Sequence, residues 1–309
     1  MELERLHLDR PHPLTSPAAR YGASMAYDTA TSQLLLFGGY NGTTYMSDTW
    51  AWTGTTWEQL SPTTSPTGRY GASLAYDPAM SGGELVLLGG RTGAATCGSD
   101  TWTWSGSNWT QLTPVASPPQ RYEAAFAYDT ATSHMVLFGG NGGSALADTW
   151  LWTGTNWTSS APSLSPTARY GETLAYSPAI GQLVLLGGQT AGGYDNSTWA
   201  WANNNWAQLS SSTNPPVRTT AAMALDQSSG QMVVFGGYNG TSYLGDTWQW
   251  SVTAVTGVSP SSGPLAGGTS VTITGMGFNA VTGVITGTPD TLGTYTVTLG
   301  SKPPSTWPV

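Results

Sequence analysis

Short apolar stretches alternate with clusters of glycine and polar residues along most of the chain. One of them, Gln33–Phe37, is apolar at four of its five positions, which indicates a strand buried on both faces. Asp48–Trp52 instead holds two tryptophans two residues apart, so both indoles project from one face of a strand. Ala23–Tyr27 and Thr56–Leu60 complete a set of four short strands. Because no stretch keeps a helical period, the pattern predicts an all-β chain with tight turns.

The same pattern returns five times, at intervals of 48 to 52 residues. Each unit opens on an arginine, continues to a double glycine that ends the second strand, and then reaches a Trp-x-Trp strand. The opening arginines are Arg20, Arg69, Arg121, Arg169 and Arg218. Four short strands at this period are typical of β-propeller blades, which pack face to face around an axis. Since each buried tryptophan removes about 150–250 Å² from water, the tryptophans are expected to supply most of the cohesion between blades.

The arginine, the double glycine and the spaced tryptophans resemble the kelch repeat over residues 16–250. The resemblance implies a kelch-type β-propeller, related to the central domain of galactose-oxidase-like proteins. The five repeats predict five four-stranded blades in residues 1–252. Kelch rings usually have six or seven blades, so the repeats form either a five-bladed ring or part of a larger array. The fifth unit lacks the third tryptophan that follows Trp-x-Trp in the other units. We expect Leu3–Leu8 to supply the missing strand and close the ring.

The tryptophan pattern stops after about residue 252, and residues 253–309 form a separate unit. Val258–Phe278 resembles the opening strands of an IPT/TIG immunoglobulin-like domain, and Gly283–Thr298 resembles the closing strands of bacterial Ig-like modules. These 57 residues are few for a full sandwich of about 100, so we expect a short or truncated Ig-like module. By resemblance, such modules are spacers and adhesion elements, which implies an extracellular or cell-surface location.

Composition excludes several classes of partner and of structure. Charged residues make up 8% of the chain and the net charge is -8, which argues against binding nucleic acid or anionic membranes. The 15 tryptophans and 14 tyrosines argue against disorder. No apolar run approaches the ~18 residues that span a bilayer, and the first fifteen residues lack the apolar core of a secretory signal. The single cysteine, Cys97, excludes an internal disulfide framework.

The candidate binding face holds the loops before the first strand and between the second and third strands of each unit. In a four-stranded meander these loops emerge on the same side, and they carry the repeated arginines and several tyrosines. The arginines either form a docking ring for an acidic or sugar ligand or each pair with the aspartate that precedes Trp-x-Trp. Arg169 is expected to be free, because Ser197 replaces that aspartate. The candidate ligand-binding residues are Arg20, Tyr21, Tyr40, Arg69, Tyr70, Arg121, Tyr122, Arg169, Tyr170, Arg218 and Tyr238.

No catalytic, metal or cofactor site is predicted. The copper centre of galactose-oxidase-like enzymes implies two histidine ligands, and His134 is the one histidine within the repeats. One aspartate per blade cannot converge on a calcium ion, which needs 6–8 oxygen ligands. Glu123 and Glu172 begin the first strands of neighbouring units and remain a candidate carboxylate pair for glycoside hydrolysis.

These features predict a non-enzymatic interaction or adhesion scaffold of a bacterial surface or secreted protein. We expect its partner to be a protein or a glycan that binds at the loop face. We expect it to bind no nucleic acid and no cofactor and not to insert into a membrane. Two alternatives stay open. One is a carbohydrate-binding or carbohydrate-active propeller, and the other is a structural fragment of a longer repeat protein.

Overall fold

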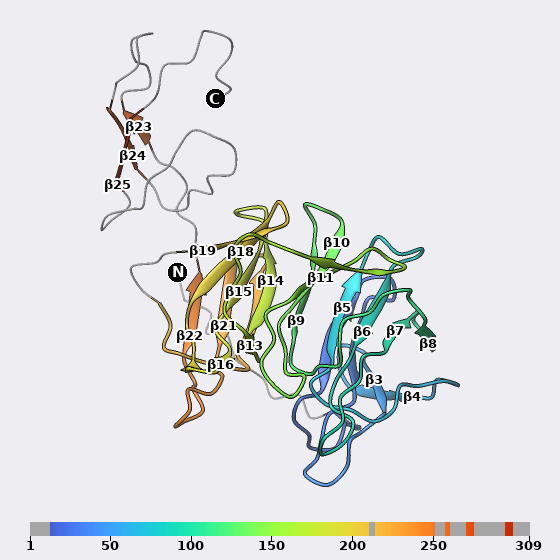
Figure 1. The fold of residues 1–309 in the computed structure, drawn as a ribbon. Coiled ribbons are helices and arrows are strands. Elements are labelled where there is room, and N and C mark those ends of the chain that lie inside the picture. The colour runs from blue at the N-terminus through green and yellow to red at the C-terminus, as the bar shows by residue number, and fades with distance from the viewer. Residues whose placement is uncertain (1–12, 210–213, 251–256, 260–269, 275–293, 299–309) are drawn as a thin grey trace, which may run out of the picture.

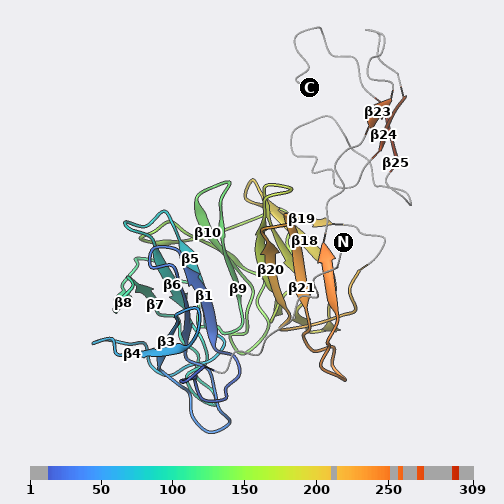
Figure 2. The ribbon, with the colours of Figure 1, turned by 180° about the vertical axis from the view of Figure 1, so that it is seen from behind.

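The computed structural model describes residues 13–209, 214–250, 257–259, 270–274 and 294–298. In this part of the chain the five repeats form five antiparallel sheets, each built from strands in chain order. The sheets follow one another as blades, and Figures 1 and 2 show blade one and blade five at opposite ends of the row.

Four blades have four described strands each, and the fifth has three. Blade one comprises β1 (Ser24–Asp28), β2 (Gln33–Phe37), β3 (Thr49–Trp52) and β4 (Trp57–Leu60). Blade two comprises β5 (Ser73–Asp77), β6 (Glu84–Leu88), β7 (Thr101–Trp104) and β8 (Trp109–Leu112). Blade three comprises β9 (Ala125–Asp129), β10 (His134–Phe138), β11 (Thr149–Trp152) and β12 (Trp157–Ser160). Blade four comprises β14 (Thr173–Ser177), β15 (Gln182–Leu186), β18 (Thr198–Ala202) and β19 (Asn205–Leu209). Blade five comprises β20 (Ala222–Asp226), β21 (Gln231–Phe235) and β22 (Thr247–Trp250).

Two further small sheets lie outside the blades. One joins the two-residue strands β13 (Arg169–Tyr170), β16 (Gln189–Thr190) and β17 (Gly193–Tyr194) in the loops of blade four. The other, in the C-terminal unit, joins β23 (Gly257–Ser259), β24 (Ser270–Thr274) and β25 (Thr294–Thr298).

The all-β fold and the repeated four-stranded sheets expected from the sequence are confirmed, and the expected strands of the first unit agree within one residue at each end. The short strands β13, β16 and β17 were not expected, because runs of two residues carry no alternation. The expectation that Leu3–Leu8 completes blade five lies outside the described residues, as does most of the Ig-like unit.

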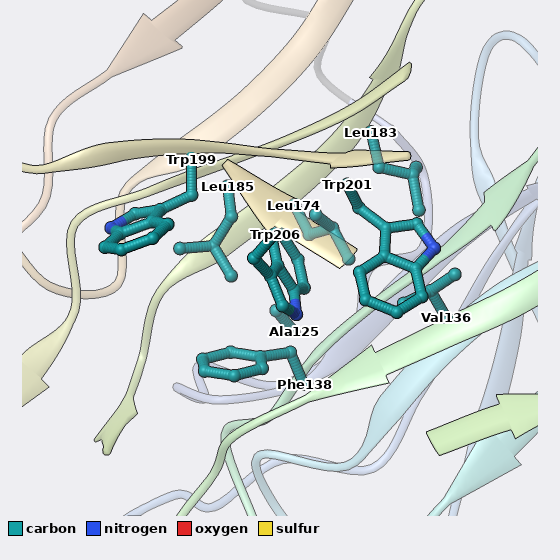
Figure 3. Packing of buried hydrophobic residues seen from close by; sticks show 9 residues of the cluster. All are labelled: Ala125, Val136, Phe138, Leu174, Leu183, Leu185, Trp199, Trp201 and Trp206. Atoms are coloured by element: carbon teal, nitrogen blue, oxygen red, sulfur yellow. The ribbon is translucent and has the colours of Figure 1, made fainter. Parts of the chain in front are cut away.

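Each blade has two faces, because alternate residues of a strand point to opposite sides. We name the face toward the next blade in the sequence the forward face, and the face toward the preceding blade the rear face. Leu35 and Phe37 on the forward face of blade one pack against Leu87, Trp104 and Trp109 on the rear face of blade two. The rings of Phe37 and Trp109 lie 5.0 Å apart. The same arrangement recurs between later blades, and Figure 3 shows it between blades three and four.

The double glycine after each second strand permits close packing between blades. Gly38 has a φ of 71°, and a Cβ there would lie 2.6 Å from the carbonyl oxygen of Arg69 in the next blade. The neighbouring Gly39 donates its N–H to that same oxygen at 2.8 Å. Any side chain at Gly38 would therefore break the junction between two blades, which explains the pair in the first four units.

A tryptophan–threonine hydrogen bond crosses three of the junctions. The indole Nε1 of the fourth strand donates to the hydroxyl of the threonine that begins the third strand of the preceding blade. The pairs are Trp109 with Thr49 at 2.9 Å, Trp157 with Thr101 at 2.9 Å and Trp206 with Thr149 at 3.0 Å. All three indoles are buried, so each bond satisfies a donor that water does not reach.

Replacing Thr101 by valine is expected to lower the free energy of unfolding by about 1–3 kcal/mol, because the buried Nε1 of Trp157 loses its acceptor. Thr110 on β8 is the matched control, because its side chain is exposed and no described indole donates to it. Thr110→Val is therefore expected to leave stability unchanged. Urea unfolding of both variants measures the difference, and equal losses would contradict the role assigned to the bond.

Candidate functional site: the tyrosine face

The five repeated arginines are parts of the framework. In blade three, Arg121 Nε donates to the carbonyl of Pro119 at 3.0 Å, and Nη1 donates to the carbonyl of Gly139 at 2.8 Å. Both Nη atoms also bind the carboxylate of Asp148, at 2.8 and 2.6 Å. The side chain of Arg121 is 1% exposed. Four of its five N–H donors thus tie together three chain segments of one blade, and the buried side chain is not accessible to a ligand.

The paired aspartate receives a second donor from the Trp-x-Trp strand. The indole of Trp150 donates to Asp148 at 2.7 Å. Burial alone would raise the pKa of Asp148, but the hydrogen bonds and charge of Arg121, with the indole bond, bring that pKa below its ordinary value. The carboxylate is therefore ionised at neutral pH. The same arginine–aspartate pair recurs in all five blades, with N–O distances of 2.5 to 3.1 Å.

The prediction that Arg169 is free is wrong. In blade four the carboxylate comes from Asp195, two residues before the expected position, and it lies 3.1 Å from Arg169 Nη1. Ser197, which stands at the expected position, accepts a hydrogen bond from Arg169 at 3.2 Å and donates to Asp195. Aspartate pairing, the alternative to a docking ring, therefore describes all five arginines, including Arg20, Arg69 and Arg218.

The tyrosines that follow these arginines remain at the surface and lie next to one another. The ring centroids of Tyr21 and Tyr70 are 5.6 Å apart, and those of Tyr70 and Tyr122 are 5.7 Å apart. Tyr170 continues the row at 6.4 Å from Tyr122. In the fifth unit Thr219 takes the equivalent position. One aromatic ring per blade thus forms a continuous row across blades one to four.

Loops after the double glycines add further tyrosines to this row. Each loop is joined to the arginine–tyrosine segment of its own unit by an isolated β-bridge or a short strand pair, as between Tyr21 and Tyr40. Tyr45 stacks on Tyr70 with an interplanar angle of 12°. At the other end of the row, Tyr238 contacts Tyr194 and Tyr243. We call this set the tyrosine face, and it comprises Tyr21, Tyr40, Tyr45, Tyr70, Tyr122, Tyr170, Tyr194, Tyr238 and Tyr243.

Arg91 is a residue of this face that the sequence reasoning did not select. Its guanidinium carbon lies 5.5 Å from the centroid of the Tyr122 ring, and its Nε donates to the carbonyl of Gly93 at 3.1 Å. Among the described residues it is the one basic side chain that forms no ion pair with an aspartate. A count of charges could have found it, because Arg91 is the arginine within the repeats that is left after one is assigned to each aspartate.

The structure does not bring Glu123 and Glu172 together as an accessible catalytic pair. Glu172 is 7% exposed, and its Oε1 accepts the N–H of Ala125 at 3.3 Å across the junction of blades three and four. No substrate can reach a carboxylate in that position, so the prediction of a hydrolytic pair is wrong. Glu123 lies nearer the tyrosine face, where burial raises the pKa of its carboxyl and Arg91 lowers it in part.

Three further observations concern metal binding, the Cys97 thiol and membrane insertion. Among the described residues, no group of three or more histidine, cysteine, aspartate or glutamate side chains lies close enough to hold a metal ion. Burial raises the pKa of the Cys97 thiol, against the charge of Arg91, so the thiol is protonated at neutral pH. In the described part of the chain, no helix is long and apolar enough to cross a membrane.

Comparison with known families gives two matches. A model of the KLHDC2/KLHL20/DRC7 Kelch-repeats domain matches residues 1–151 and 78–261 in two overlapping placements. A model of the IPT/TIG domain matches residues 254–305. No curated protein matches the chain. The two matches cover the repeats and the C-terminal unit in the order that the sequence motifs indicated.

Proposed function

This chain belongs to the Kelch-repeat family, and from that membership and the tyrosine face we propose that it is a non-enzymatic protein-interaction scaffold. Kelch and TIG domains are generally modules for protein interaction. The observation that carries the proposal is the continuous row of tyrosine rings on one face, together with Arg91, which forms no ion pair with any described residue. Tyrosine and arginine are the residue types that contribute most at protein interfaces, because each combines a large apolar surface with a polar end.

The chemistry of the face indicates the kind of partner segment. The rings offer flat apolar surface, and burial raises the pKa of the Tyr70 and Tyr122 phenols, so these hydroxyls are neutral hydrogen-bonding groups at neutral pH. Arg91, placed over Tyr122, offers a bidentate site for a carboxylate. The preferred partner is therefore a peptide segment with an aspartate or glutamate flanked by apolar side chains.

The setting in which the scaffold acts is also part of the proposal. We place it outside the cell, as an adhesion or interaction element of a bacterial surface or secreted protein. Support comes from the small number of charges and from the TIG match that follows the repeats, the arrangement expected of a module with a spacer.

Selection from a random peptide library displayed on phage tests this function with the full chain as bait. Enriched peptides are expected to carry an acidic residue, and Arg91→Ala and Tyr70→Ala are each expected to weaken their binding by at least about tenfold. Tyr27→Ala is the matched control, because Tyr27 is 53% exposed but lies outside the tyrosine face. Equal binding by all three variants would contradict the proposal. A parallel glycan array that alone gives binders would favour the carbohydrate alternative.

A further inference from the structure

The row of blades begins on an uncovered apolar face. On the rear face of blade one, Met25 and Tyr27 are 55% and 53% exposed. Their equivalents in blade two, Leu74 and Tyr76, pack into the junction with blade one. The four blade junctions follow the strand order β1, β5, β9, β14 and β20, and the described parts of β20 and β1 share no comparable packing.

The row also ends on an uncovered apolar face. On the forward face of blade five, Phe235 is 53% exposed, whereas Phe37 and Phe138 at the same position of blades one and three are 1% and 0% exposed. Ala222 and Ala224 of the same face are exposed as well. Repeat arrays normally protect such ends with polar capping repeats. Among the described strand residues of these two faces, Asp226 at the end of β20 is the one charged side chain.

The hydrogen-bonding groups of the two ends are complementary. At each of the four internal junctions, the second glycine of the pair donates its N–H to the carbonyl of the next blade's arginine, as Gly188 does to Arg218 at 2.9 Å. At the end of the row, Gly237 offers the same N–H and has no acceptor among the described residues. At the beginning, the Arg20 carbonyl has no described donor.

Two further groups extend this match. In blades two to five, the backbone N–H of the repeated arginine also donates to a loop carbonyl of the preceding blade, as Arg218 does to Asp195 at 3.0 Å. The backbone N–H of Arg20 in blade one has no such partner in the described chain. Likewise the Trp57 indole lacks a described acceptor, whereas the equivalent Trp109 donates to Thr49. Thr247 of blade five is the threonine that would accept the Trp57 indole if the two ends met.

We propose that the forward face of blade five binds the rear face of blade one in a second copy of this chain. The contact repeats, between copies, the junction that the chain builds four times within itself, so the apolar side chains and the hydrogen-bonding groups are already in register. Such a contact is heterologous, because the two partners use different surfaces. An assembly of any number of copies therefore keeps one unbound rear face at one end and one unbound forward face at the other, and copies associate head to tail.

Sedimentation velocity and light scattering of the full chain, over a rising concentration series, test this proposal. The mass is expected to rise above that of one chain. Phe235→Asp and Tyr27→Asp each place a carboxylate in the contact, and each is expected to weaken association by roughly 100-fold or more. Val115→Asp is the matched control, because Val115 is 98% exposed and lies outside both end faces. It is expected to associate as the unmodified chain does.

Mixing the two blocked variants gives the sharpest result. The Phe235→Asp chain keeps an intact rear face and the Tyr27→Asp chain keeps an intact forward face. An equimolar mixture is therefore expected to form a dimer and no larger species, although each variant alone stays monomeric. A monomeric unmodified chain would overturn the proposal and favour closure of the row within one chain or by another partner. Association of either variant at the unmodified strength, or a mixture without dimers, would also overturn it.

The outcome is independent of the proposed function. Both substitutions lie outside the tyrosine face, so the blocked monomers are expected to bind the selected peptides as the unmodified chain does. Near-ultraviolet circular dichroism of each variant verifies that the blades remain folded.

Discussion

Raising the pH from about 4.5 to about 8 is expected to lower the free energy of unfolding on the order of 4 kcal/mol through Glu172 alone. Burial raises the pKa of this carboxyl from 4.5 to about 8, against the lowering effects of backbone hydrogen bonds and of Arg169. Glu123 raises the pKa of Glu172 further, because two neighbouring carboxylates disfavour each other's ionisation. One oxygen of Glu172 has no hydrogen-bond partner among the described residues, so little compensates its charge.

The sign follows from the two protonation equilibria. Well below pH 4.5 the carboxyl is protonated in both the folded and the unfolded chain, and its contribution to stability is at its full value. As the pH rises, the unfolded chain releases its proton first, which favours unfolding. The loss ends near pH 8, where the folded chain releases its proton as well.

Glu172→Gln is the variant that tests this expectation, because glutamine keeps the shape of the side chain and does not titrate. The difference in unfolding free energy between the variant and the unmodified chain is expected to grow from pH 4.5 to 8 and then stay constant. Urea unfolding at a series of pH values measures it, and the titrating groups that do not interact with Glu172 cancel in the difference. A constant difference over this range would show that Glu172 is not protonated in the folded protein.

Asp148→Ala is expected to destabilise the chain by about 3 kcal/mol, because it leaves the guanidinium of Arg121 buried without its counter-charge. The indole of Trp150 loses its acceptor in the same variant. Thermal and urea unfolding measure the loss. Glu58→Ala is a suitable control, because Glu58 is exposed on β4 and forms no ion pair in the described chain.

Blade four suggests a rescue of this loss. There the acid stands two residues earlier and a serine stands in its usual place, and the arginine is still paired. The position in blade three that corresponds to Asp195 is Leu146, since both backbone carbonyls accept the N–H of the following arginine. Asp148→Ser with Leu146→Asp is therefore expected to be more stable than Asp148→Ser alone. If the double variant is no more stable than Asp148→Ser alone, the ion pair of blade four depends on the conformation of its own loop and not only on the position of the aspartate.

Much of this architecture could be predicted from the sequence because it depends on local periodicity. Strand β2 was predicted correctly from Gln33–Phe37, since an apolar run between turn residues identifies a buried strand without tertiary information. The pairing of arginine with aspartate was available as one of two alternatives, because both residues recur once in nearly every blade. The exception in blade four could not be predicted, because the path of a loop determines that the carboxylate of Asp195 reaches Arg169.

Other features depended on contacts between residues far apart in the sequence. Glu172 was expected at an accessible site. At the junction of blades two and three, the hydroxyl of Ser73 donates to the carbonyl of Ala124. In blade three the residue equivalent to Ser73 is Ala125, which has no hydroxyl. The larger Glu172 side chain occupies the equivalent junction of blades three and four and accepts from the N–H of Ala125 instead. Arg91 gave no periodic signal, and it became a candidate only when the folded loops placed it over Tyr122.

The sequence by itself determined the fold class, the five units, the order of strands within each unit and the family, because each follows from a short repeated pattern. The tertiary structure decided which repeated residues are framework and which face the solvent. The arginines are buried because each binds three chain segments of its own blade, whereas the tyrosines beside them remain partly exposed. It also decided that the first and last blades do not pack on each other in the described chain, since the meeting of two ends depends on the angles between all the blades.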